Sequence, residues 1–214
     1  MDSSIKIKVC GLTRIEDVQL ALSLGADYCG FIVYPKSPRA VSLDRAAELA
    51  SYVPVGKRVI VDVETAPEEL DQMRGSCFDY FQIHTGLQIG SPSLAFMSYQ
   101  LGKERLWLAP HLDTKDEFSD EFTTFADTIL LDAYQKDLYG GTGHTSDWPR
   151  FTQLSAAYPK TKWILAGGLT PSNVLEAQSA TGARQLDINS GVEVEPGVKD
   201  AAKLREVFQI LKPK

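Results

Sequence analysis

The hydrophobic pattern divides the chain into short apolar runs, separated by longer stretches whose apolar residues recur with helical spacing. Eight runs of four to six residues are rich in aliphatic and aromatic side chains, which is typical of strands buried on both faces. The runs are Ile5–Val9, Tyr28–Val33, Arg58–Val63, Tyr80–Ile83, Leu106–Ala109, Thr128–Leu131, Trp163–Ala166 and Gln185–Ile188. Strand and helix patterns alternate along the whole chain, which predicts the α/β class and a single (β/α)8 TIM barrel.

Signals for helix ends fall between these runs. Thr13–Glu16 has the pattern of a capping box, and Gly25 is placed to end the helix that follows. Thr170 and Pro171 fit the N-cap and the first position of a later helix. The i, i+3, i+4, i+7 spacing of Leu204, Val207, Phe208 and Leu211 predicts a buried stripe on the last helix.

The alternation is not interrupted by a Pro/Ser-rich linker, a charge block or a low-complexity segment, so residues 1–214 are predicted to form one domain. A hydrophobic content of 43% and a charged content of 23% fit one globular core. A doubly wound open sheet is the alternative architecture. Its dinucleotide-binding version is disfavoured because no GxGxxG motif follows the first apolar run.

The charge balance argues against binding to polyanions. With a net charge of -6 and an isoelectric point near 5.1, nucleic acid and anionic membranes are not expected partners. Residues 1–9 carry two lysines and lack the long apolar core of a secretory signal, and no later run is long enough to span a membrane. Three cysteines without a CxxC pair suggest neither a disulfide framework nor a zinc cage, so a reducing cytoplasm is expected.

In a parallel barrel, chemistry lies at the carboxyl ends of the strands. Three glycine-bearing turns fall late in the chain, where backbone N–H groups could hold a phosphate. The candidate phosphate-binding residues in them are Gly141, Thr142, Gly143, Gly167, Gly168, Ser190 and Gly191. One such cluster alone would more simply be a tight turn. Three of them at neighbouring strand ends favour a phosphorylated substrate.

Cys10 follows the first apolar run and is a candidate catalytic base. An inert buried thiol is the commoner fate of a lone cysteine, but the helix predicted just after Cys10 would favour the thiolate through its dipole. Side chains alternate along a strand, so Ile5, Ile7 and Val9 share one face while Lys8 and Cys10 share the other. Lys8 is therefore predicted to lie beside Cys10 in the barrel, with an ordinary ion pair to a carboxylate as the alternative.

Asp132 and Arg39 are candidates for the other chemical roles. Asp132 follows the sixth apolar run, and burial at the mouth of an apolar barrel would raise its pKa and keep it partly protonated, as a general acid requires. A helix cap or a surface carboxylate is the alternative. Arg39 ends the loop Pro35–Arg39, which two prolines stiffen, and its guanidinium could grip a carboxylate through two parallel hydrogen bonds. A merely solvated arginine is the alternative there.

No pattern for metal or acyl-transfer chemistry is found. His84, His111 and His144 fall on separate loops without ligand spacing, and the sequence contains no HExxH motif. It also lacks a GxSxG elbow. Neither a metal nor a cofactor is expected.

Several motifs, taken together and in order, resemble one enzyme family. Lys8–Thr13 reads KVCGLT and Gly30–Arg39 reads GFIVYPKSPR. Further matching segments are Gln82–His84, Leu131–Asp132, Gly140–Gly143, Leu165–Leu169, Ser190–Glu193 and Pro196–Asp200. These motifs are similar to those of phosphoribosylanthranilate isomerase, an enzyme of tryptophan biosynthesis. The combination covers the whole chain and is specific, although each motif alone is weak.

The resemblance implies a cofactor-free Amadori rearrangement of N-(5-phosphoribosyl)anthranilate to 1-(2-carboxyphenylamino)-1-deoxyribulose 5-phosphate. It implies that Asp132 is the general acid that opens the furanose ring and that Cys10 is the base that removes the C2 proton. Arg39 would bind the anthranilate carboxylate, and the late glycine turns would hold the phosphate. The other substrate-binding positions implied are Gln82, His84 and Asp187. A cytoplasmic monomer or homodimer, with a small-molecule substrate as its partner, is implied as well.

The chain departs from the family pattern at several positions. Val61–Glu64, which includes Asp62 and Glu64, stands where the family usually has Gly-Val-Phe-Val-Asn after the third strand, and His144 replaces a usual lysine. Asn189 replaces a usual serine, and Leu108–Pro110 stands where a lysine is common. These changes fall on the rim of the third to fifth strands and near the phosphate turns. The principal acid, base and arginine positions are unchanged.

Other barrels would also use a phosphate site. Indoleglycerol-phosphate synthase would need a catalytic lysine–glutamate set, and a pentose-phosphate epimerase would need a metal constellation, and neither is found in the sequence. A non-catalytic ligand-binding or scaffolding barrel is the alternative from a different class of protein.

Overall fold

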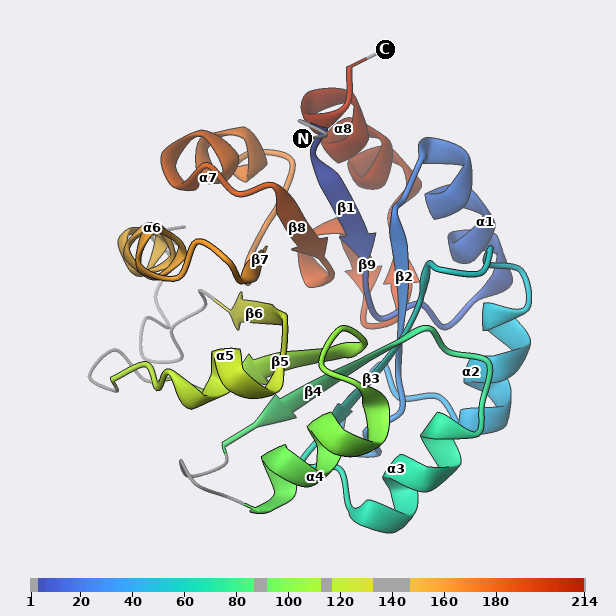
Figure 1. The fold of residues 1–214 in the computed structure, drawn as a ribbon. Helices are drawn as coiled ribbons and strands as arrows, with labels where there is room; N and C mark the ends of the chain where they lie inside the picture. The colour runs from blue at the N-terminus through green and yellow to red at the C-terminus, as the bar shows by residue number, and fades with distance from the viewer. Residues whose placement is uncertain (1–3, 87–91, 113–116, 133–146, 214) are drawn as a thin grey trace.

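A computed structural model describes residues 4–86, 92–112, 117–132 and 147–213. Figure 1 shows a ring of strands enclosed by helices, with the two chain ends close together beside α8. Eight parallel strands follow one another around a closed barrel, and β1 pairs with both β2 and β8. The (β/α)8 barrel predicted from the alternating pattern is therefore confirmed.

The barrel strands begin and end close to the predicted positions. They are β1 (Lys6–Val9), β2 (Tyr28–Ile32), β3 (Arg58–Val63), β4 (Tyr80–Thr85), β5 (Leu106–Pro110), β6 (Thr128–Asp132), β7 (Lys162–Ala166) and β8 (Gln185–Ile188). Every one of the eight apolar runs overlaps a strand, and the ends agree within two residues. Runs of this length predict strands because helices need more residues to bury a comparable face.

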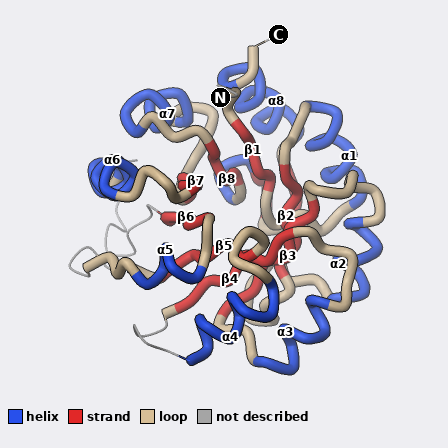
Figure 2. The backbone as a smooth tube through the Cα atoms, viewed as in Figure 1, coloured by secondary structure: helices blue, strands red, loops and turns tan. Residues whose placement is uncertain are grey.

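Helices lie outside the strand ring (Figure 2). They are α1 (Ile15–Leu24), α2 (Leu43–Ala50), α3 (Pro67–Arg74), α4 (Pro92–Leu101), α5 (Glu121–Phe125), α6 (Trp148–Ala157), α7 (Val174–Thr181) and α8 (Ala201–Leu211). Between β8 and α8 the chain forms a short 3-10 helix, η1 (Ser190–Val192), and an antiparallel hairpin of β9 (Glu193–Glu195) and β10 (Val198–Lys199). None of the helices in the described ranges is both long and apolar enough to cross a membrane.

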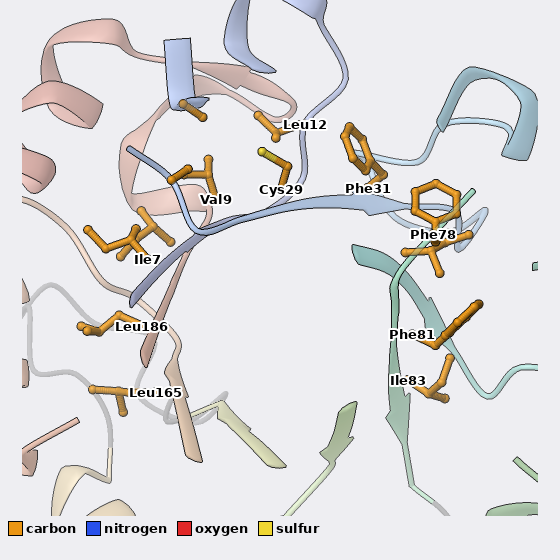
Figure 3. Packing of buried hydrophobic residues seen from close by; sticks show 14 of the residues in the cluster. Ile7, Val9, Leu12, Cys29, Phe31, Phe78, Phe81, Ile83, Leu165 and Leu186 are labelled. Atoms are coloured by element: carbon orange, nitrogen blue, oxygen red, sulfur yellow. The ribbon is translucent and has the colours of Figure 1, made fainter. Parts of the chain in front are cut away.

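The main core lies between the strand ring and the helices. Alternation along β1 directs Ile7 and Val9 outward into this layer, where both are fully buried. Figure 3 shows such side chains on the outer face of the ring, including Phe31 and Phe81. The predicted stripe of α8, Leu204, Val207, Phe208 and Leu211, is buried in the same layer. Burial of each such side chain stabilises the fold by about 1.5–3 kcal/mol.

A separate cluster fills the barrel interior. Its aromatic members Tyr28, Tyr80 and Trp107 lie at the beginnings of their strands, and the Trp107 ring centroid is 4.9 Å from those of both tyrosines. Stacked and edge-to-face rings of this kind pack densely. These rings fill the part of the barrel interior next to the amino-terminal ends of the strands.

Two predicted helix caps are wrong. The α1 helix begins at Ile15 with Arg14 as its N-cap, and Thr13 Oγ1 instead donates a hydrogen bond to the Gly197 carbonyl, 2.6 Å away. The α7 helix begins only at Val174, because residues after Thr170 first form a turn. A tertiary contact replaces the local cap at Thr13, whereas the Thr170 hydroxyl is paired with that of Ser172 inside the turn. Gly25 does end α1, with a left-handed φ of 94°.

Candidate active site

A cavity of about 370 Å³ opens at the carboxyl ends of the strands. Its lining residues are Cys10, Ile32, Val61, Gln82, His84, Leu130, Asp132, Ala166, Gly167, Gly168, Leu169, Asp187, Asn189, Ser190 and Gly191. A volume of this size is within the range of small-molecule sites, about 300–1,000 Å³. The structure therefore brings together nine residues that were predicted from the sequence as site residues: Cys10, Gln82, His84, Asp132, Gly167, Gly168, Asp187, Ser190 and Gly191.

Four predicted residues are not part of this lining. Gly141, Thr142 and Gly143 lie outside the described residues. Arg39 is described but does not line the cavity, and it lies beside the Cys10–Gly11 turn at the rim. A Cβ placed on Gly11 would be 2.7 Å from Arg39 Cδ, so this close approach requires glycine.

Cys10 lies immediately after β1, where its backbone N–H donates to the Ile188 carbonyl at 2.9 Å. The residue is 3% exposed. The predicted influence of a helix dipole on this thiol is not supported, because α1 begins five positions later, at Ile15, and dipole effects fade beyond the first turn. Burial instead raises the pKa of the Cys10 thiol, and the charge of Lys8 opposes this effect. The neutral thiol is the resting form.

Lys8 shares the barrel interior with Cys10, as the strand alternation predicted, and it also forms an ion pair. Its Nζ lies 2.9 Å from Asp187 Oδ2, and the Lys8 side chain is fully buried. Burial lowers the pKa of Lys8, but Asp187 and Cys10 outweigh that effect and raise it. The ammonium therefore stays charged next to the thiol.

Gly30 on β2 makes room for this arrangement. A Cβ at Gly30 would lie 2.9 Å from Lys8 Cε and 3.0 Å from both Lys8 Nζ and Cys10 Sγ. These distances are shorter than ordinary contacts, so a larger residue would displace the lysine or the thiol. The glycine of the GFIVYPKSPR segment thus keeps the lysine and the thiol together in the interior.

The β4 strand contributes two polar side chains to the opposite side of the cavity. Gln82 Nε2 and His84 Nε2 are 2.9 Å apart, a distance at which the amide can donate to a neutral imidazole. Burial, together with the charges of Lys8 and His111, lowers the pKa of His84 to about 4. His84 is therefore uncharged near neutral pH.

Asp132 ends β6 and faces the same cavity. Its side chain is exposed, so the burial expected at the barrel mouth is not found. Asp132 ends the strand at the rim of the cavity instead of lying within the apolar interior.

The two described glycine turns form one edge of the cavity. Gly167 and Gly168 have left-handed φ values of 92° and 61°, a conformation that favours glycine. A Cβ on Gly191 would lie 1.9 Å from the Leu169 carbonyl oxygen, so the turn after β8 packs directly on the turn after β7. Ser190 begins η1 at this edge.

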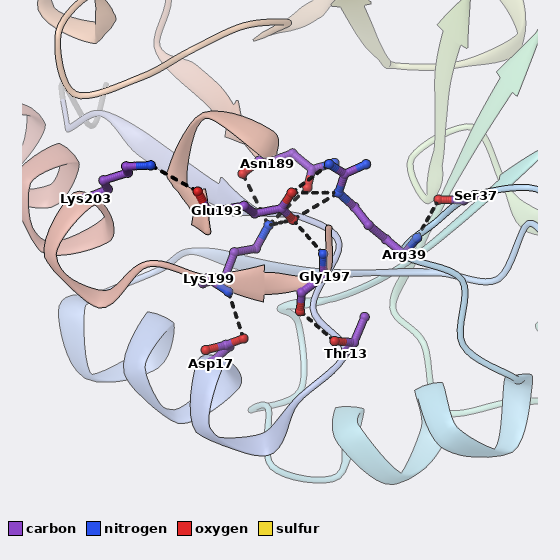
Figure 4. A network of polar contacts seen from close by, with 9 residues as sticks. All are labelled: Thr13, Asp17, Ser37, Arg39, Asn189, Glu193, Gly197, Lys199 and Lys203. Atoms are coloured by element: carbon purple, nitrogen blue, oxygen red, sulfur yellow. Dashed lines mark hydrogen bonds and ion pairs between the residues drawn. The ribbon is translucent and has the colours of Figure 1, made fainter. Parts of the chain in front are cut away.

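Two charged residues next to the cavity were not predicted as site residues. Glu193 and Lys199 belong to the hairpin after β8, and both contact residues at the cavity rim (Figure 4). The Pro196–Gly197 turn between two charged segments signals a hairpin in the sequence. Nothing in the sequence indicates that these charges are buried.

Three of the departures from the family pattern, Asp62, Glu64 and Asn189, have clear partners, whereas His144 lies outside the described residues. Asp62 is buried and accepts a hydrogen bond from Thr65 Oγ1 at 2.8 Å. Glu64 has a left-handed φ of 50° and accepts a hydrogen bond from the Gly86 N–H. Asn189 accepts a hydrogen bond from Lys199 through Oδ1 at 3.0 Å. In the described part of the chain, no group of three or more His, Cys, Asp or Glu residues could hold a metal ion.

A closed parallel barrel with a polar cavity at its catalytic end defines a (β/α)8-barrel enzyme. The family model of N-(5'-phosphoribosyl)anthranilate isomerase matches residues 7–210. This chain belongs to that family, as the sequence motifs indicated.

Individual relatives agree over nearly the full length. The chain is 34% identical over 209 residues to the isomerase of Acinetobacter calcoaceticus, covering 95% of each. It is 36% identical over 213 residues to that of Geotalea uraniireducens, covering 95% of this chain and 97% of the relative. The solved structure of the Thermotoga maritima isomerase is similar with a TM-score of 0.78 and 28% identity, covering 98% of this chain and 100% of that one.

Proposed function

We propose that the protein catalyses the Amadori rearrangement of N-(5'-phosphoribosyl)anthranilate, a step of tryptophan biosynthesis, by general acid and base catalysis. The observation that carries this assignment is that Cys10 and Asp132, from β1 and β6, line one cavity in a chain of this isomerase family. Two proton-transferring groups on strands across the barrel from each other can act on two atoms of one bound sugar.

In the proposed reaction, Asp132 donates a proton to the furanose ring oxygen while the bond from that oxygen to C1 breaks. The nitrogen lone pair forms the C1 iminium. The Cys10 thiolate then removes the C2 proton, and the electrons of that C–H bond move into a C1–C2 double bond as the iminium is neutralised. The resulting enolamine tautomerises to the ketone. Abstraction at C2 is feasible because the adjacent iminium accepts the electron pair.

Lys8 supports the base in this scheme. Burial keeps Cys10 a neutral thiol at rest, and an adjacent cation lowers the free energy of its thiolate. The iminium formed after ring opening adds a second positive charge near the thiol. Cys10 is therefore expected to lose its proton most readily when the substrate is bound.

Two buried oxygens are suited to the sugar. Asp187 Oδ1 and Gln82 Oε1 are buried, and neither has a hydrogen-bond partner among the described residues. Unsatisfied buried acceptors are costly, so a ligand that brings hydroxyl donors would be favoured there. We assign Asp187 and Gln82, with His84 beside them, to substrate binding.

The glycine edge is assigned to the phosphate. Gly167, Gly168, Ser190 and Gly191 lie together at the ends of β7 and β8, where barrels of this type hold phosphate groups. The family resemblance assigns Gly141–Gly143 to phosphate binding as well. Arg39 is assigned to the anthranilate carboxylate.

The reaction moves only protons and electron pairs within one molecule, so we expect no metal or cofactor to be required. We also expect one domain for the chain. A solved relative binds the reduced product analogue 1-(2-carboxyphenylamino)-1-deoxyribulose 5-phosphate, and another, from Thermotoga maritima, is described as dimeric. For this chain we propose a monomer or homodimer.

The decisive experiment is an isomerase assay on freshly prepared phosphoribosylanthranilate, followed by loss of its fluorescence. We expect turnover that EDTA does not change. Absence of turnover in a folded protein would favour a barrel that retains the ligand cavity without the chemistry. Loss of activity to EDTA, restored by zinc or magnesium, would overturn the cofactor-free mechanism.

A further inference from the structure

Arg39 is held by a carboxylate of this chain. Arg39 Nε lies 2.9 Å from Glu193 Oε1 and 3.0 Å from Oε2, and Nη2 lies 2.6 Å from Oε2. The Glu193 side chain is 5% exposed. Figure 4 shows the Glu193 carboxylate between Arg39 and Lys199, so one carboxylate serves two cations.

Lys199 fixes Glu193 from the other side. Its Nζ donates to Glu193 Oε1 at 2.8 Å, to Asn189 Oδ1 at 3.0 Å and to the Asn189 carbonyl at 3.3 Å. An ammonium has three protons, so these bonds use all of them. The Gly197 N–H also donates to Glu193 Oε1 at 3.2 Å. Lys199 therefore has no proton left for a ligand and serves to hold Glu193 and Asn189 in place.

Arg39 keeps one edge of its guanidinium available. Glu193 occupies the Nε–Nη2 edge, and within the described residues no hydrogen bond reaches Nη1. A guanidinium can bind a second carboxylate through its Nη1–Nη2 edge. Two cations against one carboxylate also leave the Arg39–Glu193–Lys199 cluster with one excess positive charge. This one excess positive charge is complementary to the single negative charge of a ligand carboxylate.

The cluster reaches the cavity through the turn at Gly11. A Cβ on Gly11 would lie 2.6 Å from Asn189 Oδ1 and 2.7 Å from Arg39 Cδ, so both side chains pack on the backbone next to Cys10. Asn189 itself lines the cavity. The Arg39 side chain thus passes the rim next to the backbone of the candidate base.

We propose that Glu193 is a positioning residue: it orients Arg39 so that the Nη1–Nη2 edge meets the carboxylate of the substrate, and Lys199 holds Glu193 in that position. The proposal rests on the proposed function, because the carboxylate is that of the anthranilate ring. The proposal predicts the direction in which loss of Glu193 changes the affinity for the carboxylate. Removing the negative charge of Glu193 leaves more positive charge at the rim, which alone would strengthen binding of an anion. Loss of the orientation should weaken it.

The test is calorimetric binding of two probes to the whole protein. One probe is the reduced product analogue, which carries a carboxyphenyl ring. The other is the same compound with an unsubstituted phenyl ring, so it lacks the carboxylate. In Glu193→Gln we expect about tenfold weaker binding of the carboxylate probe and unchanged binding of the phenyl probe, because only the carboxylate needs an oriented guanidinium for its charge-assisted hydrogen bonds. Glu195→Gln is the matched control, because it removes the same charge from an exposed position of β9 and should change neither affinity.

A double variant separates orientation from charge. Glu193→Gln with Lys199→Met keeps the net charge of the cluster and leaves no unpaired lysine, so it also serves if the single variant fails to fold. We expect the carboxylate probe to bind as weakly as in the single variant. Recovered binding in the double variant, tighter binding in Glu193→Gln, or equal losses for both probes would overturn the proposal.

These measurements do not depend on turnover. If the wild-type protein discriminates between the probes but does not turn over the substrate, the proposed reaction is contradicted. The role of Glu193 is then still tested by comparing the binding of the two probes to wild type and Glu193→Gln. A wild-type protein that isomerises the substrate but binds both probes equally would contradict the role of Glu193 and leave the reaction intact.

Discussion

The two sides of the cavity handle polar groups in different ways. On the side formed by β8, β1 and β2, charged side chains are buried in direct pairs: Lys8 with Asp187, and Glu193 with both Arg39 and Lys199. On the side formed by β4 and β6, the polar groups are uncharged or exposed. His84 is neutral because its pKa is about 4, and Asp132 is exposed at the rim.

This difference follows the cost of burying charge. An isolated buried ion loses several kcal/mol of hydration, so charges survive in the interior only with close partners. The β8–β1–β2 side therefore needs fixed geometry, and Gly11 and Gly30 provide the space for it. The proposed base thus lies where neighbouring charges control it, and the proposed acid lies where solvent can reprotonate it.

The comparison predicts that one residue on each side is indispensable. Cys10→Ala and Asp132→Asn should each lower kcat by at least about a hundredfold, because each removes a group that transfers a proton, with little change in ligand affinity. Steady-state and binding measurements on both variants would check this. Cys29→Ala is the matched control, since Cys29 is a buried thiol on the outer face of the neighbouring strand and should leave kcat unchanged. Near-normal turnover in either site variant would remove that residue from the mechanism.

The next largest effect is expected at the rim of the charged side. Arg39→Met should lower kcat/KM by about ten- to a hundredfold, mostly through KM, because about 1.5–3 kcal/mol of charge-assisted hydrogen bonding is lost. For a substrate with a phenyl ring in place of the anthranilate ring, Arg39→Met should leave kcat/KM nearly unchanged. Equal losses for both substrates would mean that Arg39 shapes the loop and does not bind the carboxylate.

The sequence was sufficient for the fold and for most of the cavity. Apolar runs define the strands, and the barrel places whatever follows each strand at one end, so Cys10, His84 and Asp132 could be grouped without knowing any contact. The solvent exposure and the pKa of the individual site residues were harder to predict. The exposure of Asp132 and the raised pKa of Cys10 depend on packing around each group, which no local pattern encodes.

The charged cluster could not be predicted for a related reason. Arg39 and Glu193 are 154 residues apart, and a glutamate beside a Pro-Gly turn has the pattern of a surface residue. The same explanation holds for Thr13, whose hydroxyl is bonded to a carbonyl 184 residues away instead of capping its own helix. Local signals fail where a distant segment competes for the same group.

A third prediction concerns how the charged side controls the base. Lys8→Met removes the cation that opposes the raised pKa of Cys10, so the limb of the kcat/KM profile that rises with thiolate formation should move to higher pH. A pH series on folded enzyme would measure the shift. Lys6→Met, at an exposed position of the same strand, is the control and should leave the limb in place. An unmoved limb in Lys8→Met would mean that the substrate provides the activation.

The smallest effect is expected on the neutral side, and it concerns stability. The pKa of His84 is about 4 in the folded protein, below the ordinary value of 6.5. Between these values the unfolded chain binds a proton that the native state excludes, so the free energy of unfolding should fall as the pH falls from 6.5 towards 4. His84→Gln removes this titration and should flatten that part of the profile. Urea unfolding across the range would measure it.

The control for this experiment is His111→Gln, at an exposed position whose ring centroid is 6.1 Å from that of His84. It removes a histidine from the same region but leaves the buried imidazole in place, so most of the slope should remain. If His84→Gln keeps the full slope, other groups cause the acid sensitivity, and His84 is not held neutral by burial. Burial of His84 would then not explain the neutral character of the β4 side, and the contrast between the two sides would rest on the exposure of Asp132.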